Sequence, residues 1–342
     1  MLLHPSSVII KVEEEEKFIA MTKTLKKNKI DMLHGPIWNK LPLFALPVAA
    51  TAVLEQLFNA ADLAVVGNFT TGDPTVAVAA VGANTPVVGL LLNFFIGISL
   101  GANVVIANAI GRGDEDTVHK TVHTAVLMAL LGGVLTALVG QGIAGWLLGL
   151  LNVPADVLPS ALVYLRIYLI GMPVIFLYNF EAAIFRSVGE TKVPLMALTF
   201  AGVLNVVLNL FFVIALKMGV SGVATATVLS NTVSSAILFY RLTHIDSSIR
   251  VEPRALRIHG SSLSKILQIG LPAALQNSVF MVANVVIQSA INSLGTTVIA
   301  ASSAAFNIEI NAYYVFNSFS QACTTFVGQN YGARQLDRCR RT

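Results

Sequence analysis

The sequence predicts an all-α protein that crosses a membrane several times. Of its 342 residues, 55% are hydrophobic and only 12% are charged, and the mean hydropathy is +0.74. A water-soluble domain of this size has no core large enough to bury so many apolar side chains. Uncharged apolar stretches of about 20 residues recur along the chain, and a helix of that length crosses a hydrocarbon layer about 30 Å thick.

We predict eight spans, separated by short turns that are polar or contain Gly or Pro. They cover residues 41–67, 84–110, 121–148, 160–185, 194–216, 221–241, 266–292 and 303–327. Pro47, Pro173 and Pro272 lie inside apolar runs, which membrane helices tolerate better than soluble ones. Such interruptions indicate packing within a bundle, and Gly97 and Gly101 predict a close approach of two helices.

The basic residues predict the orientation, because loops that stay in the cytoplasm keep Lys and Arg. With an even number of spans and a cytoplasmic N-terminus, 20 of the 22 basic residues fall in inner segments, and only Lys217 and Arg166 do not. The net charge of +4 then follows from topology, so no nucleic-acid partner is needed. We expect a multi-pass protein of the inner (cytoplasmic) membrane, in contact with the lipid bilayer.

Residues 1–40 are polar and include an acidic run, which predicts a cytoplasmic tail and not a cleavable signal peptide. Met1 and Met21 are both candidate start residues. Cys323 and Cys339 fall in the last span and the final inner segment, and two cysteines so placed do not indicate a disulfide framework. The sequence shows no His-rich metal spacing, nucleophile elbow or Walker loop, so we do not expect an enzyme.

A short internal repeat divides the chain. The segment ALPVAA at residues 45–50 recurs as GLPAAL at residues 270–275, so that the two prolines lie 225 positions apart. The first copy closes on AIGRG at residues 109–113, and the second closes on NYGAR at residues 330–334, an offset of 221 positions. Repeats of this kind mark many secondary transporters.

The repeat predicts two lobes in the same orientation. Residues 41–245 would form an N-terminal lobe of six helices, residues 246–265 a cytoplasmic linker between the lobes, and residues 266–342 the first two helices of a C-terminal lobe. If both lobes have six helices, the chain is truncated after the eighth of twelve. A natural protein of eight spans is the alternative.

Several segments together resemble the multidrug and toxic compound extrusion (MATE) transporters. They are Leu46-Pro47 followed by NAAD at residues 59–62 and VVGN at residues 65–68, then AAVG at 79–82, FRSVGETKVP at 185–194 and VGQNYGA at 327–333. The chain is similar to the family over about residues 28–342. This resemblance implies two six-helix lobes around a central cavity that opens alternately to each side of the membrane.

Asp62 is the strongest candidate for a functional group. An ionisable side chain inside a span costs about 2.5–3.5 kcal/mol on insertion scales, and seven uncharged residues place Asp62 about 10 Å along the helix from the next turn. Glu55, Asn59 and Asp62 are spaced to share one stripe of the first helix, and Asn205 and Asn209 share a face of the fifth. The alternatives are that Asp62 caps a neighbouring helix and that the asparagines only join helices by hydrogen bonds.

The resemblance implies that Asp62, Asn205 and Asn209 form a coupling site for H⁺ or Na⁺, with Glu55 and Asn59 beside it and with no further cofactor. Asp62 is then a candidate Na⁺ ligand. Many relatives carry Asp where this chain has Asn209. Because a single carboxylate lowers the charge of the site, proton coupling is favoured over sodium.

Further polar residues in the spans are candidates for the wall of a substrate cavity, with helix packing as the alternative role of each. They are Tyr178, Glu181, Asn277, Asn284, Glu309 and Tyr314. The resemblance implies a monomeric antiporter that exports amphipathic or cationic organic compounds. The alternatives are a lipid-linked saccharide flippase, whose cavity should carry several basic residues, and a truncated fragment that transports nothing.

Overall fold

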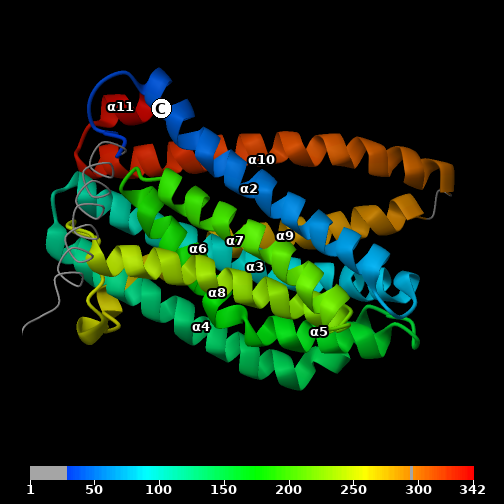
Figure 1. The fold of residues 1–342 in the computed structure, drawn as a ribbon. Coiled ribbons are helices and arrows are strands. Elements are labelled where there is room, and N and C mark those ends of the chain that lie inside the picture. The colour runs from blue at the N-terminus through cyan, green and yellow to red at the C-terminus, as the bar shows by residue number, and fades with distance from the viewer. Residues whose placement is uncertain (1–28, 293–295) are drawn as a thin grey trace, which may run out of the picture.

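The computed structural model describes residues 29–292 and 296–342, where every regular element is a helix. The long helices lie side by side, and both ends of the described chain lie at the same end of the bundle (Figure 1). Most of the predicted tail, including Met1 and Met21, lies outside the described residues. The helices are α2 (Ile37–Phe69), α3 (Pro74–Gly111), α4 (Glu115–Leu150), α5 (Leu158–Ile170), α6 (Met172–Ser187), α7 (Lys192–Leu210), α8 (Val220–His244), α9 (Gly260–Asn292), α10 (Thr296–Gly332) and α11 (Leu336–Arg341).

The apolar helices confirm a multi-pass membrane protein. In the described part of the chain, six helices are long and apolar enough to cross a membrane, and the bent pair α5 and α6 adds a seventh. The eighth predicted span lies within α10, which does not meet this criterion because asparagines and Glu309 interrupt its apolar sequence. A helix, or in one case a bent pair of helices, covers each of the eight predicted spans.

The predicted span over residues 160–185 is a bent pair of helices and not one straight helix. The helix breaks at Gly171, and α5 and α6 meet at an angle of 51°. Pro173 lacks a backbone N–H and its ring crowds the carbonyl of Leu169, so a straight helix cannot continue through it. The break also packs tightly against α8, since a Cβ on Gly171 would lie 2.5 Å from Cγ2 of Val228.

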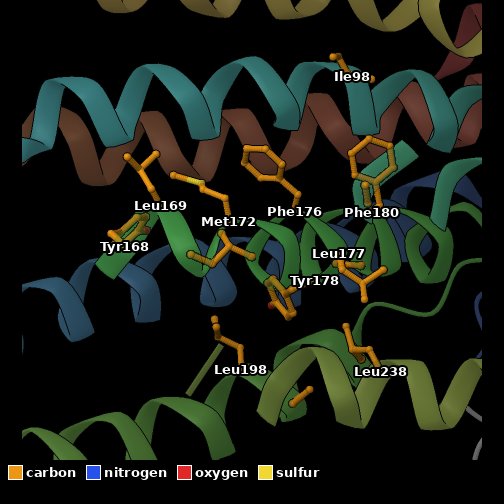
Figure 2. Close-up of a cluster of buried hydrophobic side chains, with 14 of the residues drawn as sticks. Ile98, Tyr168, Leu169, Met172, Phe176, Leu177, Tyr178, Phe180, Leu198 and Leu238 are labelled. Carbon is orange, nitrogen blue, oxygen red and sulfur yellow. The ribbon is translucent and has the colours of Figure 1, made fainter. Parts of the chain in front are cut away.

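The core of the bundle gathers around α6. Figure 2 shows Phe176 and Phe180 on the face of α6 toward Ile98 of α3, while Tyr178 lies on the opposite face toward Leu198 and Leu238. Both phenylalanines are completely buried. Between membrane helices this close packing stabilises the fold through van der Waals contact and not through exclusion of water.

The two copies of the repeat meet through small residues. A Cβ on Gly101 of α3 would lie 2.3 Å from the carbonyl oxygen of Ile266 and 2.8 Å from Cα of Gly270 in α9. At the other contact, a Cβ on Gly332 of α10 would lie 2.1 Å from the carbonyl oxygen of Asn108 in α3. The predicted close approach at Gly101 is therefore present, and it joins the first repeat to the second.

The predicted linker, residues 246–265, lies against α4. The backbone N–H of Glu252 donates to Nε2 of His123 at 3.0 Å, and the N–H of His259 donates to Oγ1 of Thr124 at 3.1 Å. Nδ1 of His123 is 2.8 Å from the carbonyl oxygen of His119, so the ring proton belongs on Nδ1 and the imidazole is neutral. The linker also contains a short 3₁₀ turn, Pro253–Ala255, before α9 begins at Gly260.

Candidate functional site

The Asp62 carboxylate lies at the junction of three helices. It projects from the last third of α2 and is only 4% exposed. Asn209 of α7 donates from Nδ2 to Asp62 Oδ1 at 2.5 Å, and Thr227 of α8 donates from Oγ1 to Asp62 Oδ2 at 3.1 Å. Each carboxylate oxygen therefore has a hydrogen-bond donor from a different helix.

Asn205 completes this group, which we call the Asp62 cluster: Asp62, Asn205, Asn209 and Thr227. Asn209 Nδ2 also donates to Asn205 Oδ1 at 3.0 Å, and the Asn205 amide lies 3.5 Å from Thr227 Oγ1. Asn209 Oδ1 is buried and has no hydrogen-bond partner in the described part of the chain. A buried amide oxygen without a partner is an acceptor position that a ligand or water can fill.

The donor set suits an ionised carboxylate. The amide hydrogens of Asn209 face Asp62, and such charge-assisted hydrogen bonds compensate in part for the loss of water around the charge. When Asp62 is protonated, the Thr227 hydroxyl can turn its single hydrogen to the carbonyl oxygen of Val223 and accept from Oδ2, so the same residues surround the carboxyl. A bound cation, by contrast, needs oxygens around it, so the Asn209 amide would have to rotate until Oδ1 faced Asp62. Among the described residues, no group of three or more His, Cys, Asp or Glu side chains is placed to hold a metal ion.

The structure separates the remaining α2 candidates from this cluster. Glu55 and Asn59 are exposed, and neither hydrogen bonds to Asp62. Glu55 interacts electrostatically with Arg186 of α6. The predicted stripe exists on the helix, but only Asp62 is enclosed by other helices, so the roles of Glu55 and Asn59 remain predictions.

The candidates for the cavity wall do not form one surface. Tyr178 and Glu181 are buried inside the first lobe. Asn277 of α9 is half-buried and donates to the carbonyl oxygen of Asn93 at 3.2 Å. Asn284 and Tyr314 are also half-buried, whereas Glu309 is exposed.

Two pockets are prominent, and the six candidates line neither. One, of about 450 Å³, lies between the α2–α3 and α7–α8 turns and the start of α5. The other, of about 680 Å³, lies between α3, α9 and α10, with Arg112 and Lys265 among its lining residues. The role of the six candidate residues as the wall of a substrate cavity therefore remains a prediction.

Thr227 is the member of the Asp62 cluster that sequence reasoning missed. Its hydroxyl lies 3.0 Å from the carbonyl oxygen of Val223. A threonine in a helix commonly donates to the carbonyl four residues before it in this way. Most threonines of α8 make the same bond, including Thr232 with Val228. The sequence therefore holds no signal that distinguishes Thr227, and only the packing of α8 against α2 reveals its second bond.

Comparisons with known proteins give a consistent result. The MatE family model matches residues 47–211 and 272–342. "Probable multidrug resistance protein YpnP" of Bacillus subtilis is 30% identical over 311 residues, which is 88% of this chain and 67% of that protein. "Probable multidrug resistance protein YoeA" of the same organism is 27% identical over 325 residues, or 92% of this chain and 68% of that protein.

Solved structures give the same fold. The structure titled "Crystal structure of MATE in the bent conformation" matches with a TM-score of 0.84 at 24% identity, over 91% of this chain and 69% of that one. The chain thus spans about two thirds of the length of the proteins that it matches.

Proposed function

Because the chain belongs to the MATE family of multidrug efflux transporters, we propose that it is a secondary antiporter whose coupling ion binds at Asp62. It would lie in the inner membrane with a cytoplasmic N-terminus and act as a monomer without a cofactor. Its substrates would be amphipathic or cationic organic compounds. The names of the two Bacillus subtilis relatives, both multidrug resistance proteins, support this substrate class.

The enclosed carboxylate of Asp62 is the observation that carries the proposal. Burial of a charge among apolar helices is costly, and a fold that only needed packing would be more stable with an apolar side chain there. Asp62 instead receives donors from α7 and α8. A group so placed can take up a proton and release it when the helices around it move, which links ion movement to a change of shape.

We propose H⁺ as the coupling ion, with Na⁺ as the alternative. The Asp62 cluster contains one carboxylate, and Asn209 turns its amide hydrogens toward it. A proton is compatible with this arrangement, whereas Na⁺ needs rotated amides and more oxygen ligands. A lipid-linked saccharide flippase has less support, because the spans carry almost no basic residues.

The test is efflux of ethidium from liposomes that contain the purified protein. An imposed proton gradient and an imposed sodium gradient are compared for the wild type and Asp62→Asn. Asp73→Asn is the matched control, because it makes the same chemical change at an exposed carboxyl that caps α3. We expect the proton gradient to drive efflux in the wild type and the control but not in Asp62→Asn.

Two other outcomes would contradict parts of the proposal. Efflux that needs the sodium gradient would replace H⁺ by Na⁺ as the coupling ion. Efflux by Asp62→Asn at the wild-type rate would show that coupling lies elsewhere. If the wild type moves no ethidium or other organic cation in either gradient, the chain does not act as an antiporter of this class.

A further inference from the structure

Glu181 is a second buried carboxyl group in the first lobe. It lies on α6, is fully buried and accepts one hydrogen bond, from Oγ of Ser235 in α8 to Oε2 at 3.0 Å. Oε1 is buried and has no hydrogen-bond partner in the described part of the chain. The hydroxyl of Tyr178, three residues earlier on α6, is also buried without a partner. These groups share no hydrogen bond with the Asp62 cluster.

The surroundings of Glu181 do not compensate a negative charge. Within the described residues, its one titratable neighbour by electrostatic interaction is Tyr178, which also interacts with Glu55 of α2 and Arg186 of α6. From α8 the facing group is the neutral Ser235. An ionised carboxylate with one hydrogen bond and no cation nearby is costly in such a place, whereas the neutral acid is not. In this conformation Glu181 therefore carries a proton.

The end of α6 that follows Glu181 is connected to the second repeat. Gln329 of α10 donates from Nε2 to the carbonyl oxygen of Ser187, the last residue of α6, at 2.6 Å. Asn103 of α3 donates to the carbonyl oxygen of Ala183 at 3.0 Å, and Thr325 of α10 donates to Asn103 Oδ1 at 3.0 Å. The other end of α6 begins at the break at Gly171. A displacement of α10 would therefore act on α6 close to Glu181.

We propose that Glu181, together with Ser235 and Tyr178, is a second proton-binding site of the transporter. The Glu181 carboxyl holds a proton while α6 packs against α8 as it does here. When α10 moves and pulls the end of α6, water reaches Oε1, and the proton leaves the carboxyl for that water. The inference rests on the proposed antiport function, and it adds one proton per cycle to the proton bound at Asp62.

The first experiment reads the proton at Glu181 directly and needs no transport. Infrared spectra of the purified protein, taken in H₂O and D₂O, are compared for the wild type, Glu181→Gln and the control Glu115→Gln, which makes the same change at an exposed acid of α4. We expect a carbonyl band of a protonated carboxylic acid in the wild type and the control, and its loss in Glu181→Gln. Ser235→Ala should keep the band but shift its frequency, because the hydrogen bond to Oε2 is removed.

The second experiment measures the ratio of protons to substrate in liposomes. The proton gradient that just balances a known substrate gradient gives this ratio. We expect it to fall about twofold in Glu181→Gln, since one of two coupled protons is lost, and to stay unchanged in Glu115→Gln. The glutamine keeps the size of the side chain and an oxygen for the Ser235 hydroxyl, so the protein should fold.

Support requires both results. A carboxylic-acid band that is not reduced in Glu181→Gln, or a proton ratio that does not change, overturns the proposal. An unchanged ratio with a lost band would mean that Glu181 is only a neutral packing group. Failure of the proposed function is recognised separately, because it shows as normal gradient-driven efflux in Asp62→Asn and leaves the infrared result at Glu181 untouched.

Discussion

The two copies of the internal repeat have similar backbones but differ in what they bury. The helices α2 and α9 both have 33 residues, and α3 and α10 have 38 and 37. The turns after them agree in detail, since Gly113 has φ +68° and Arg334, 221 positions later, has φ +59°. Yet Asp62 is buried, and the residue 225 positions after it is Ile287, which is 56% exposed.

The surroundings of each repeat explain this difference. Asp62 is enclosed because α7 and α8 supply Asn209 and Thr227. In the second repeat, Asn277 of α9 reaches a backbone carbonyl of α3 and no ionisable group. The repeated sequence thus specifies the long helices and their turns, whereas the helices that pack around one copy enclose Asp62.

The contact between the copies gives the largest expected effect. Gly101→Leu should destabilise the protein by about 3 kcal/mol, because its side chain would meet the backbone of α9 at Ile266 and Gly270. Gly82→Leu is the control, since a Cβ on this glycine of the same helix meets nothing within 4 Å. Thermal unfolding of the detergent-purified variants measures both effects, and equal loss in both would disprove the close contact.

The contribution of α8 to the first repeat is tested at Thr227. Thr227→Val keeps the shape of the side chain but removes one donor to Asp62, a charge-assisted hydrogen bond of about 1.5–3 kcal/mol. We expect proton-driven efflux to fall roughly tenfold, since 1.4 kcal/mol is a factor of ten. Thr232→Val removes a hydroxyl that donates to a backbone carbonyl only and should transport normally. Similar rates in the two variants would exclude a role for the Thr227 hydroxyl.

The turns that follow the two repeats predict smaller changes in stability, of opposite sign in the two copies. Both Gly113 and Arg334 adopt a left-handed conformation, which costs a residue with a Cβ about 1 kcal/mol. Gly113→Ala should therefore lower the stability by about 1 kcal/mol, and Arg334→Gly should raise it by a smaller amount. Thermal unfolding is again the measurement. A change of the same sign in both variants would show that the two turns do not share one conformation.

The smallest expected change in stability concerns Asp114 and Gln335, the residues that follow Gly113 and Arg334. Asp114 caps α4, and hydrogen bonds from the Thr117 side chain and backbone hold the pKa of its carboxyl below the ordinary value of 3.8. The ionised cap is thus fully stabilising above pH 3.8, and its contribution is lost as the pH falls through the lowered pKa. Because the Asp114 side chain is 40% exposed, we expect Asp114→Ala to cost at most about 1 kcal/mol at neutral pH.

The matching position in the second repeat is the control for this cap. Gln335, 221 positions after Asp114, begins α11 without a side-chain cap. Gln335→Ala should therefore show no loss of stability that disappears at low pH. Thermal unfolding at neutral and acidic pH compares the two variants, and a pH-independent loss in Asp114→Ala would contradict a role for its charge.

Most of the fold could be predicted from the sequence, because long apolar runs in a membrane can only form helices. The break at Gly171 does not follow from Pro173 alone, since a proline inside a span either bends or ends a helix, and which of the two occurs depends on packing such as that of Gly171 against Val228. In α10, asparagines and Glu309 interrupt the apolar sequence, but its 37 residues are still long enough to cross a membrane.

The site could be predicted only in part. Asp62, Asn205 and Asn209 lie in contact as spacing and family resemblance suggested, because helical periodicity places polar residues on shared faces. Glu55 follows the same periodicity on α2 but stays exposed. Which part of a polar stripe is enclosed depends on where other helices cross it, and this depends on contacts across the whole lobe.

The hydrogen bonds that attach the linker to α4 limit where the chain between the two repeats can move. Glu252, His259 and Ser262 are all held by side chains of α4, so this part of the linker belongs mechanically to the first lobe. This part of the linker is not a flexible connection. A displacement of α9 relative to α4 would therefore have to begin beyond Ser262, and it would also have to disturb the close contact that α9 makes with α3 at Gly101 and Gly270.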